Sequence, residues 1–337
     1  MGLLQKIKRP PWRTIIPGCG FIVLVSAGYL LWSPGLDVRD GRDDRNHNGI
    51  WISHGWFAAD AWFIHNQNTN QITLYRERSR IRNLAGLLRS HHITDVFLHL
   101  CPADEHGRLP ETDPQQIERF LDEFGGFRVM PWIGGPSGSQ VRIGDLKWRA
   151  NFVKAVLDLL AAHPRLAGVH INIEPMTSGD ANFLVLLDEL RIALPKDKLI
   201  SIAAYPPPTW FQPSEDVHWS QDYFRQVARR ANQMVVMMYD TALQKPRLYQ
   251  HLIAGWTDEV LDWSGDTPVL LGVPTYDDPG VDYHNPKVEN LPNALLGIHR
   301  GLAHKPLPGN YQGIAIYCEW ETDTNEWQYL EGHFLNM

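Results

Sequence analysis

The chain has 337 residues, of which 44% are hydrophobic and 20% are charged, and its formal net charge at pH 7 is −7. This length allows one large domain with a proper core, or two small domains. The mild negative charge, and the lack of a basic run after the N-terminal region, exclude nucleic acid as an expected partner.

The N-terminal 32 residues are typical of a membrane anchor. Residues 15–32 contain no charged side chain and are long enough to cross a bilayer as a helix. Residues 1–14 form a basic segment whose cations should stay in the cytoplasm: Lys6, Lys8, Arg9 and Arg13. We therefore expect a single-pass membrane protein with its soluble part on the extracytoplasmic side, periplasmic or extracellular. A cleaved signal peptide is the alternative, and the charged residues 33–48 predict a solvated linker.

Cysteine usage and motif spacing give no sign of a metal or cofactor. Beyond the N-terminal segment only Cys101 and Cys318 remain, which is too few for a disulfide framework or a structural zinc site. We expect both to be buried thiols, and we expect no bound metal and no cofactor.

Strand and helix patterns alternate from residue 49 to the C-terminus. Eight apolar, β-rich runs are predicted strands: residues 49–56, 94–100, 127–133, 167–173, 199–204, 233–239, 268–274 and 313–317. Helical periodicity follows each run: residues 81–90, 114–124, 146–163, 181–193, 221–231, 248–263, 291–303 and a short helix from residue 325.

This alternation predicts parallel strands buried on both faces. Eight such units fit one (β/α)8 TIM barrel over residues 49–337, preceded by the transmembrane helix. An open doubly wound sheet is the rival, but no glycine-rich phosphate loop follows the first strand. We find no break that would start a second domain.

The fourth strand carries polar residues where a buried strand should be apolar. Side chains alternate along a strand, so His170, Asn172 and Glu174 share one face and point into the barrel and toward its mouth. The apolar set between them should face the helices. Buried polar groups are costly without partners or a function, so the strand end is either a satisfied polar layer or a catalytic site.

The sixth strand ends with Tyr239 and Asp240. Taken alone, the pair reads as a core tyrosine followed by a helix-capping aspartate. Its place at a strand end gives it a second interpretation, as part of an active site at the barrel mouth.

Taken together, the strand ends resemble the family 18 glycoside hydrolases, the chitinase-like family. That family has D-G-x-D-x-D-x-E at the fourth strand, and here residues 167–174 read A-G-V-H-I-N-I-E. Its S-x-G-G at the third strand is similar to W-I-G-G at residues 132–135. Its M-x-Y-D and G-V-P patterns match residues 237–240 and 272–274, the latter followed by Tyr276. The family's eighth strand usually ends in a tryptophan below the sugar, where this chain has Tyr317 with Trp320 close by. The matches fall in order on five strands between about residues 127 and 320.

The resemblance implies a retaining hydrolase in which the substrate's own 2-acetamido group is the nucleophile. Glu174 would protonate the leaving oxygen, the residue at position 172 would orient the acetamido N–H, and Tyr239 would hydrogen-bond the acetamido group, with Asp240 beside it. Candidate glycan-binding residues are His170, Trp56, Trp132, Trp210, Tyr276, Tyr317 and Trp320. The expected partner is a polysaccharide or peptidoglycan-like glycan.

The three aspartates of the family pattern are absent, and only its glutamate remains. Asn172 can accept a hydrogen bond but supplies no charge, and a cationic His170 would lower the proton affinity of the glutamate. We therefore expect His170 to be neutral and hydrogen-bonded. Two alternatives stay open: a catalytically inactive glycan-binding barrel, and a two-carboxylate glycosidase that pairs Glu174 with Asp240 or Glu319.

Overall fold

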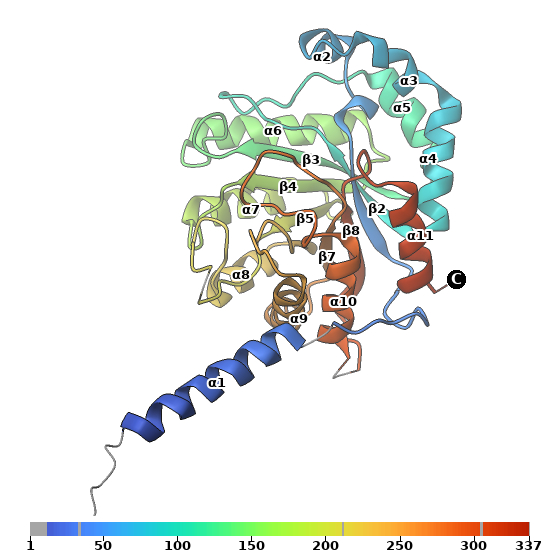
Figure 1. The fold of residues 1–337 in the computed structure, drawn as a ribbon. Helices are drawn as coiled ribbons and strands as arrows, with labels where there is room; N and C mark the ends of the chain where they lie inside the picture. Colours follow the sequence, from blue (N-terminus) through green and yellow to red (C-terminus); the bar gives the residue numbers. More distant parts are fainter. Residues whose placement is uncertain (1–11, 33–34, 211, 304–305, 337) are drawn as a thin grey trace, which may run out of the picture.

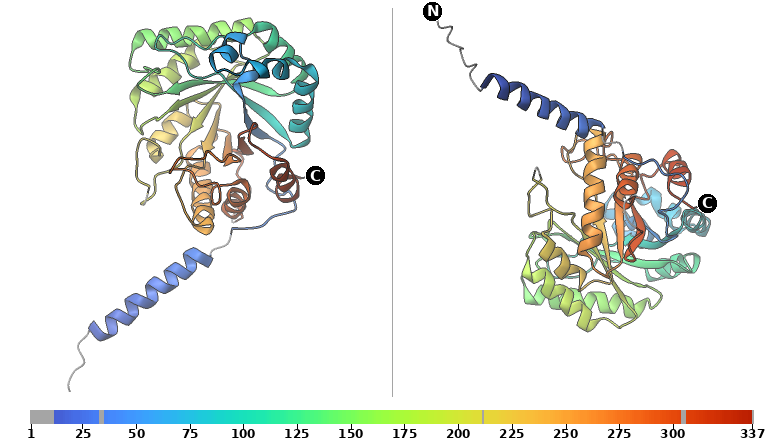
Figure 2. Two further views of the ribbon diagram at one scale, coloured as in Figure 1. Left: turned by 45° about the horizontal axis from the view of Figure 1, so that its top comes forward. Right: turned by 90° about the horizontal axis from the view of Figure 1, so that it is seen from below.

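Eight parallel strands close into one barrel in the computed structural model, which describes residues 12–32, 35–210, 212–303 and 306–336. Each strand pairs with its neighbours in sequence, and β1 closes the ring against β8. Figures 1 and 2 show the ring of helices around it. The strands are β1 (Asn48–Ile52), β2 (Ile93–His99), β3 (Arg128–Pro136), β4 (Gly168–Glu174), β5 (Leu199–Ala204), β6 (Gln233–Met237), β7 (Val269–Pro274) and β8 (Tyr311–Tyr317). The predicted TIM barrel is confirmed, and the open doubly wound sheet is excluded.

The helices that follow the strands begin close to the predicted positions. Asp113, Asp145 and Asp180 each accept hydrogen bonds from backbone N–H groups of a first turn, which fixes where three of the helices start. The helices are α4 (Arg78–Ser90), α5 (Pro114–Glu123), α6 (Leu146–Ala162), α7 (Ala181–Ala193), α8 (Gln221–Ala228), α9 (Pro246–Trp263), α10 (Leu291–Leu302) and α11 (Thr324–His333).

The connection between β1 and α4 contains short elements that the sequence pattern did not predict. The first strand ends at Ile52 rather than at residue 56, and a 3₁₀ turn, η1 (His54–Trp56), follows it. Three further short helices complete the connection: α2 (Asp60–His65), η2 (Thr69–Gln71) and α3 (Ile72–Arg76). Each is too short to carry a recognisable 3.6-residue period.

Apolar side chains form two layers, one inside the barrel and one between the barrel and its helices. As predicted, Val169, Ile171 and Ile173 of β4 lie in the outer layer. The inner layer consists of Trp51, Phe97, Cys101, Met130, Trp132, Val235, Leu270 and Ala315. Cys101 and Cys318 are buried free thiols, as expected.

The segment before β1 packs on the barrel instead of forming a solvated linker. Asp43 and Asp44 are buried, and their carboxylates each lie 2.5 Å from a histidine nitrogen, on His299 and His92 respectively. These contacts hold the charged segment against the amino-terminal end of the barrel.

A helix precedes this segment, but the predicted membrane anchor is overturned. Within the described part of the chain, no helix is both long and apolar enough to cross a membrane. The helix is α1 (Trp12–Trp32), which extends away from the barrel beside α9 in Figure 1. The expected single-pass location outside the cytoplasm is corrected with it, and most of the predicted basic segment, residues 1–11, lies outside the described residues.

Candidate active site

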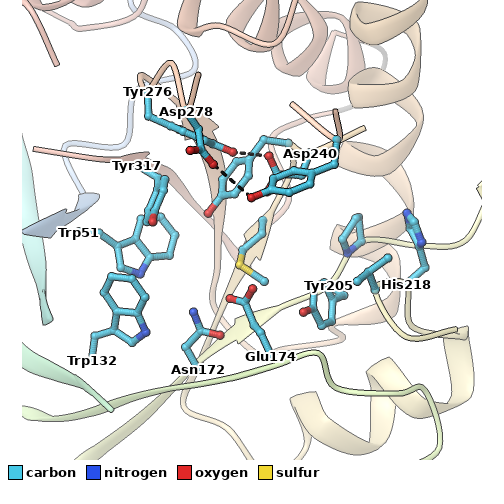
Figure 3. A pocket seen from close by; sticks show the side chains of 15 residues that line it. Trp51, Trp132, Asn172, Glu174, Tyr205, His218, Asp240, Tyr276, Asp278 and Tyr317 are labelled. Atoms are coloured by element: carbon cyan, nitrogen blue, oxygen red, sulfur yellow. Dashed lines mark hydrogen bonds between the residues drawn. The ribbon is translucent and has the colours of Figure 1, made fainter. Parts of the chain in front are cut away.

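A cavity of about 450 Å³ opens at the carboxyl ends of the strands. Figure 3 shows carboxylate, amide and phenol groups converging on it from several strands. Its walls consist of Trp51, Trp132, Asn172, Glu174, Tyr205, Pro206, Val217, His218, Met237, Tyr239, Asp240, Tyr276, Asp278, Tyr283 and Tyr317. The four predicted catalytic residues therefore meet in one cavity, as do three of the predicted glycan-binding residues.

Glu174 is the last residue of β4, and its side chain reaches into the cavity (Figure 3). The side chain is exposed to the cavity, but the surrounding walls partly desolvate its carboxyl and raise its pKa above the ordinary value. A hydrogen bond from Asn172 opposes this, and the negative charge of Asp240 adds to the rise. A carboxyl group with a raised pKa holds its proton to higher pH, which is the property that a general acid needs.

Asn172 lies two residues earlier on the same face of β4 and is 7% exposed. Its amide oxygen has no hydrogen-bond partner among the residues that the structure describes. A buried acceptor without a partner costs free energy that a bound donor would recover. Asn172 therefore has a buried amide oxygen that lacks a protein donor, while its hydrogen bond to Glu174 lowers the pKa of that carboxyl.

Tyr239 and Asp240 lie two and three residues after the end of β6. Burial raises the pKa of Tyr239 well above its usual value, so its hydroxyl remains a proton donor. Its ring stacks on Tyr317 of β8, with ring centroids 5.5 Å apart. The Asp240 backbone has a positive φ of 61°, and its carboxylate accepts a hydrogen bond from the Tyr276 hydroxyl. Figure 3 shows this contact at the edge of the cavity.

A glycine at the end of β3 allows this geometry. Gly134 has a φ of 127°, and a Cβ atom there would lie 2.1 Å from the carbonyl oxygen of Asn172. A larger residue would push β3 away from the strand that carries Asn172 and Glu174. The glycine pair singled out in the sequence thus has a structural reason that does not depend on any ligand.

His170 lies beneath the cavity and does not line it. The side chain is fully buried, and its Nε2 accepts a hydrogen bond from the indole N–H of Trp51 at 3.1 Å. Because an indole only donates, Nδ1 carries the proton and donates to the Ser201 hydroxyl at 2.9 Å. Burial lowers the pKa of His170 to about 3, so the ring is neutral, in agreement with the sequence-based expectation.

The predicted aromatic residues divide into those that line the cavity and those that do not. Trp132 and Tyr317 form part of its wall. Trp56 is instead buried against Tyr75 because the η1 turn redirects it. Trp320 is 43% exposed beside Tyr317 but outside the lining, and Trp210 is 92% exposed away from it.

Several lining residues were not identified from the sequence. Trp51 lies on the inward face of β1, and its alternation with Ile50 and Ile52 is a signal that could have indicated this. Tyr205 directly follows β5, and Tyr239 lies two residues after the end of β6. Met237 belongs to the pattern at residues 237–240 but was not identified as a site residue. Five more lie in loops, where no pattern points to them: Pro206, Val217, His218, Asp278 and Tyr283.

The sequence matches no protein-family model and no curated protein. Similar solved structures include the spore cortex-lytic enzyme SleL of Bacillus megaterium, with a TM-score of 0.55 and 11% identity over 86% of this chain and 74% of that one. A chitinase of Chromobacterium violaceum has a TM-score of 0.52 and 14% identity over 74% of this chain and 95% of that one. A single-residue variant of GH5_18 from Streptomyces cattleya, in complex with Manβ1-4GlcNAc, has a TM-score of 0.52 and 15% identity over 86% of this chain and 75% of that one.

At these identities the comparisons show a common fold, the TIM barrel, and nothing finer. A family 5 enzyme stands among the neighbours beside the chitinase. The neighbours therefore do not select family 18 over other barrel hydrolases, and the function has to be argued from the cavity itself.

Proposed function

We propose that this chain is a glycoside hydrolase that cleaves glycans containing N-acetylhexosamine, and that its catalytic unit is residues 49–337. The observation that carries the proposal is the pair on β4: Glu174, with its raised pKa, beside the partnerless amide oxygen of Asn172. The names of the structural neighbours support the substrate class, because they include a chitinase and an enzyme bound to Manβ1-4GlcNAc.

The proposed mechanism is retaining and substrate-assisted. Glu174 gives its proton to the glycosidic oxygen as the bond to the anomeric carbon breaks, and the 2-acetamido oxygen attacks that carbon to form a cyclic oxazolinium ion. The Glu174 carboxylate then takes a proton from a water molecule, which opens the ring with overall retention.

Asn172 and Tyr239 would position the acetamido group. The free amide oxygen of Asn172 is suited to accept the acetamido N–H, and the Tyr239 hydroxyl, which stays protonated, is suited to donate to the acetamido oxygen. Trp51, Trp132 and Tyr317 supply the aromatic faces that sugar rings prefer.

The two-carboxylate alternative retains one partner for Glu174. Glu319 does not line the cavity, and its carboxylate accepts from the backbone N–H of Ser53 at 3.4 Å. Asp240 lines the cavity and is the carboxylate through which that mechanism would have to operate.

The test is a turnover screen of the purified chain on N-acetylglucosamine oligomers and peptidoglycan fragments, with glucose oligomers of equal length as matched controls. We expect hydrolysis of acetamido substrates alone, products of retained anomeric configuration by NMR, and competitive inhibition by a thiazoline analogue of N-acetylglucosamine. The substrate-assisted mechanism is refuted if both series are cleaved equally well. Tight binding of oligomers without turnover would instead establish a glycan-binding barrel.

A further inference from the structure

One wall of the cavity is a long connection without regular structure, residues 275–290 between β7 and α10. It supplies Tyr276, Asp278 and Tyr283 to the cavity lining. A connection of this length needs specific contacts to hold one conformation. Those contacts gather behind the cavity wall, in a cluster formed by Asp240, His284 and Glu289.

The three side chains bring one nitrogen and two carboxylate oxygens together, all within 4.8 Å of one another. The Nδ1 atom of His284 lies 3.2 Å from a carboxylate oxygen of Asp240 and 3.8 Å from one of Glu289. Two of the three side chains are inaccessible: His284 is 5% exposed and Glu289 is fully buried.

The other ring nitrogen of His284 fixes its tautomer. Nε2 lies 2.9 Å from the backbone carbonyl of Tyr276 and must donate to it. In the neutral ring, Nδ1 then has no proton, and its lone pair faces two carboxylates. Both Nδ1 of His284 and Oε1 of Glu289 lack a hydrogen-bond partner in the described part of the chain. Three electron-rich atoms facing one another in a buried space need a positive charge, which either a proton on Nδ1 or a bound metal ion supplies.

A second buried histidine shows how a proton alone satisfies such a pair. The Nε2 atom of His299 lies 3.0 Å from the carbonyl of His333, and its Nδ1 makes a short hydrogen bond of 2.5 Å to Asp43. In the His284 cluster, two carboxylate oxygens face Nδ1, and both lie farther from it than Asp43 lies from His299. Donor atoms around a tetrahedral Zn²⁺ ion are about 3.3 Å apart, which is close to the spacing observed at His284.

We propose that Asp240, His284 and Glu289 bind a divalent transition-metal ion such as Zn²⁺. One imidazole and two carboxylates form a ligand set of the kind that zinc accepts in proteins. The remaining contacts orient the ligands, since Tyr276 donates its hydroxyl to Asp240 and the backbone N–H of Thr241 donates to Glu289 at 2.9 Å. The ion would clip the 275–290 connection to the end of β6 and so fix one wall of the cavity. This inference does not depend on the proposed hydrolase activity.

The experiment measures metal binding directly, without any glycan. The full chain is dialysed against a chelator, titrated with Zn²⁺ by calorimetry, and compared with Mg²⁺, which prefers octahedral oxygen ligands. We expect one equivalent of Zn²⁺ to bind, Mg²⁺ to bind far more weakly, and hydrogen exchange in residues 275–290 to slow when Zn²⁺ is bound.

Three variants locate the site. His284→Gln and Glu289→Gln should weaken Zn²⁺ binding at least about 100-fold, since even contacts behind a ligand are worth 10–100-fold. His299→Gln, which removes the matched buried histidine, should leave it unchanged. Co²⁺ in the wild-type chain should give visible ligand-field bands without a thiolate band, a readout that stands even if a ligand variant fails to fold. Absence of Zn²⁺ binding by the wild type, or binding that survives both ligand variants, overturns the proposal and leaves the cluster held by a proton.

Discussion

The lower half of the barrel interior and its mouth treat buried polar groups in opposite ways. Below the cavity, each donor in a continuous chain meets an acceptor: Trp51 donates to His170, His170 to Ser201, Ser201 to Gln233 at 2.8 Å, and Gln233 to Asp95 at 2.5 Å. The chain has one direction throughout, which fixes the protonation of every member. Such a network stabilises one arrangement of the strands and leaves nothing for a ligand.

The series of hydrogen bonds below the cavity ends in an ion pair. Arg128 donates two hydrogen bonds of 2.6 Å to Asp95. Burial alone would raise the pKa of Asp95, but His47 and Arg128 outweigh it and hold that pKa below its usual value. The charge on Asp95 is thus fully compensated inside the protein.

At the mouth of the barrel, the polar groups at the end of β4 lack such partners. Asn172 has an amide oxygen without a partner in the described structure, and Glu174 has a pKa raised by partial desolvation and by Asp240. A polar residue on an inward face therefore identifies a site only when its hydrogen-bonding capacity is left open. His170 and Asn172 look alike in the sequence, and only their partners separate them.

The first prediction concerns Glu174 at the mouth of the barrel. Glu174→Gln keeps the shape of the side chain and removes its transferable proton, so hydrolysis should fall by about 10²–10⁴-fold while glycan binding persists. Stability should not fall, because the change also removes a charge that Asp240 opposes. Steady-state kinetics, calorimetry and urea unfolding measure the three quantities.

Glu319→Gln is the matched control, since it makes the same chemical change outside the cavity and should leave kcat within a few-fold of the wild type. If Glu174→Gln retains full hydrolysis of a substrate, the assignment of the acid is wrong and the argument built on β4 fails with it.

A second prediction tests the hydrogen bonds below the cavity, where a substitution should lower stability. His170→Leu leaves the indole N–H of Trp51 buried without an acceptor, which should lower the free energy of unfolding by about 1–3 kcal/mol. Urea unfolding measures this loss. A double-mutant cycle with Ser201→Ala should be non-additive, because the two residues share one hydrogen bond. A His170→Leu protein as stable as the wild type would show that these hydrogen bonds contribute nothing to the free energy of unfolding.

The sequence was sufficient for the barrel and for much of the cavity, for identifiable reasons. Alternation on β4 placed Glu174 and Asn172 correctly because a strand buried on both faces has no freedom to rotate. It failed for Trp56, where the strand ends early and the η1 turn redirects the side chain. It also missed the short helices between β1 and α4, whose conformation depends on packing rather than on a period.

Contacts between distant loops were beyond the reach of the sequence. Asp240, His284 and Glu289 follow no metal-binding spacing, and the expectation of no bound metal rested on spacing alone. The closure of the barrel brings them together from the loops after β6 and β7. A fold that gathers eight loops at one end builds sites from residues that no local motif connects.

A third prediction concerns the negative charge that position 172 lacks. Asn172→Asp replaces a neutral acceptor by a charged one, and a charge-assisted hydrogen bond exceeds a neutral one by about 1–1.5 kcal/mol. Turnover of acetamido substrates should therefore rise by roughly tenfold. The new carboxylate also disfavours ionisation of Glu174 and removes the amide donor that lowers its pKa. Since the acid must be protonated to act, the basic limb of the kcat profile should move to higher pH.

Two controls separate this effect from a change of net charge. Asn182→Asp makes the same substitution at an exposed position on α7 and should change neither turnover nor the pH profile. Glucose oligomers, which lack the acetamido group, should gain nothing from Asn172→Asp, because the charge acts through the acetamido N–H. A pH limb that shifts without any gain in turnover would show that position 172 acts on Glu174 alone, and substrate assistance would then lose its main support at the mouth of this barrel.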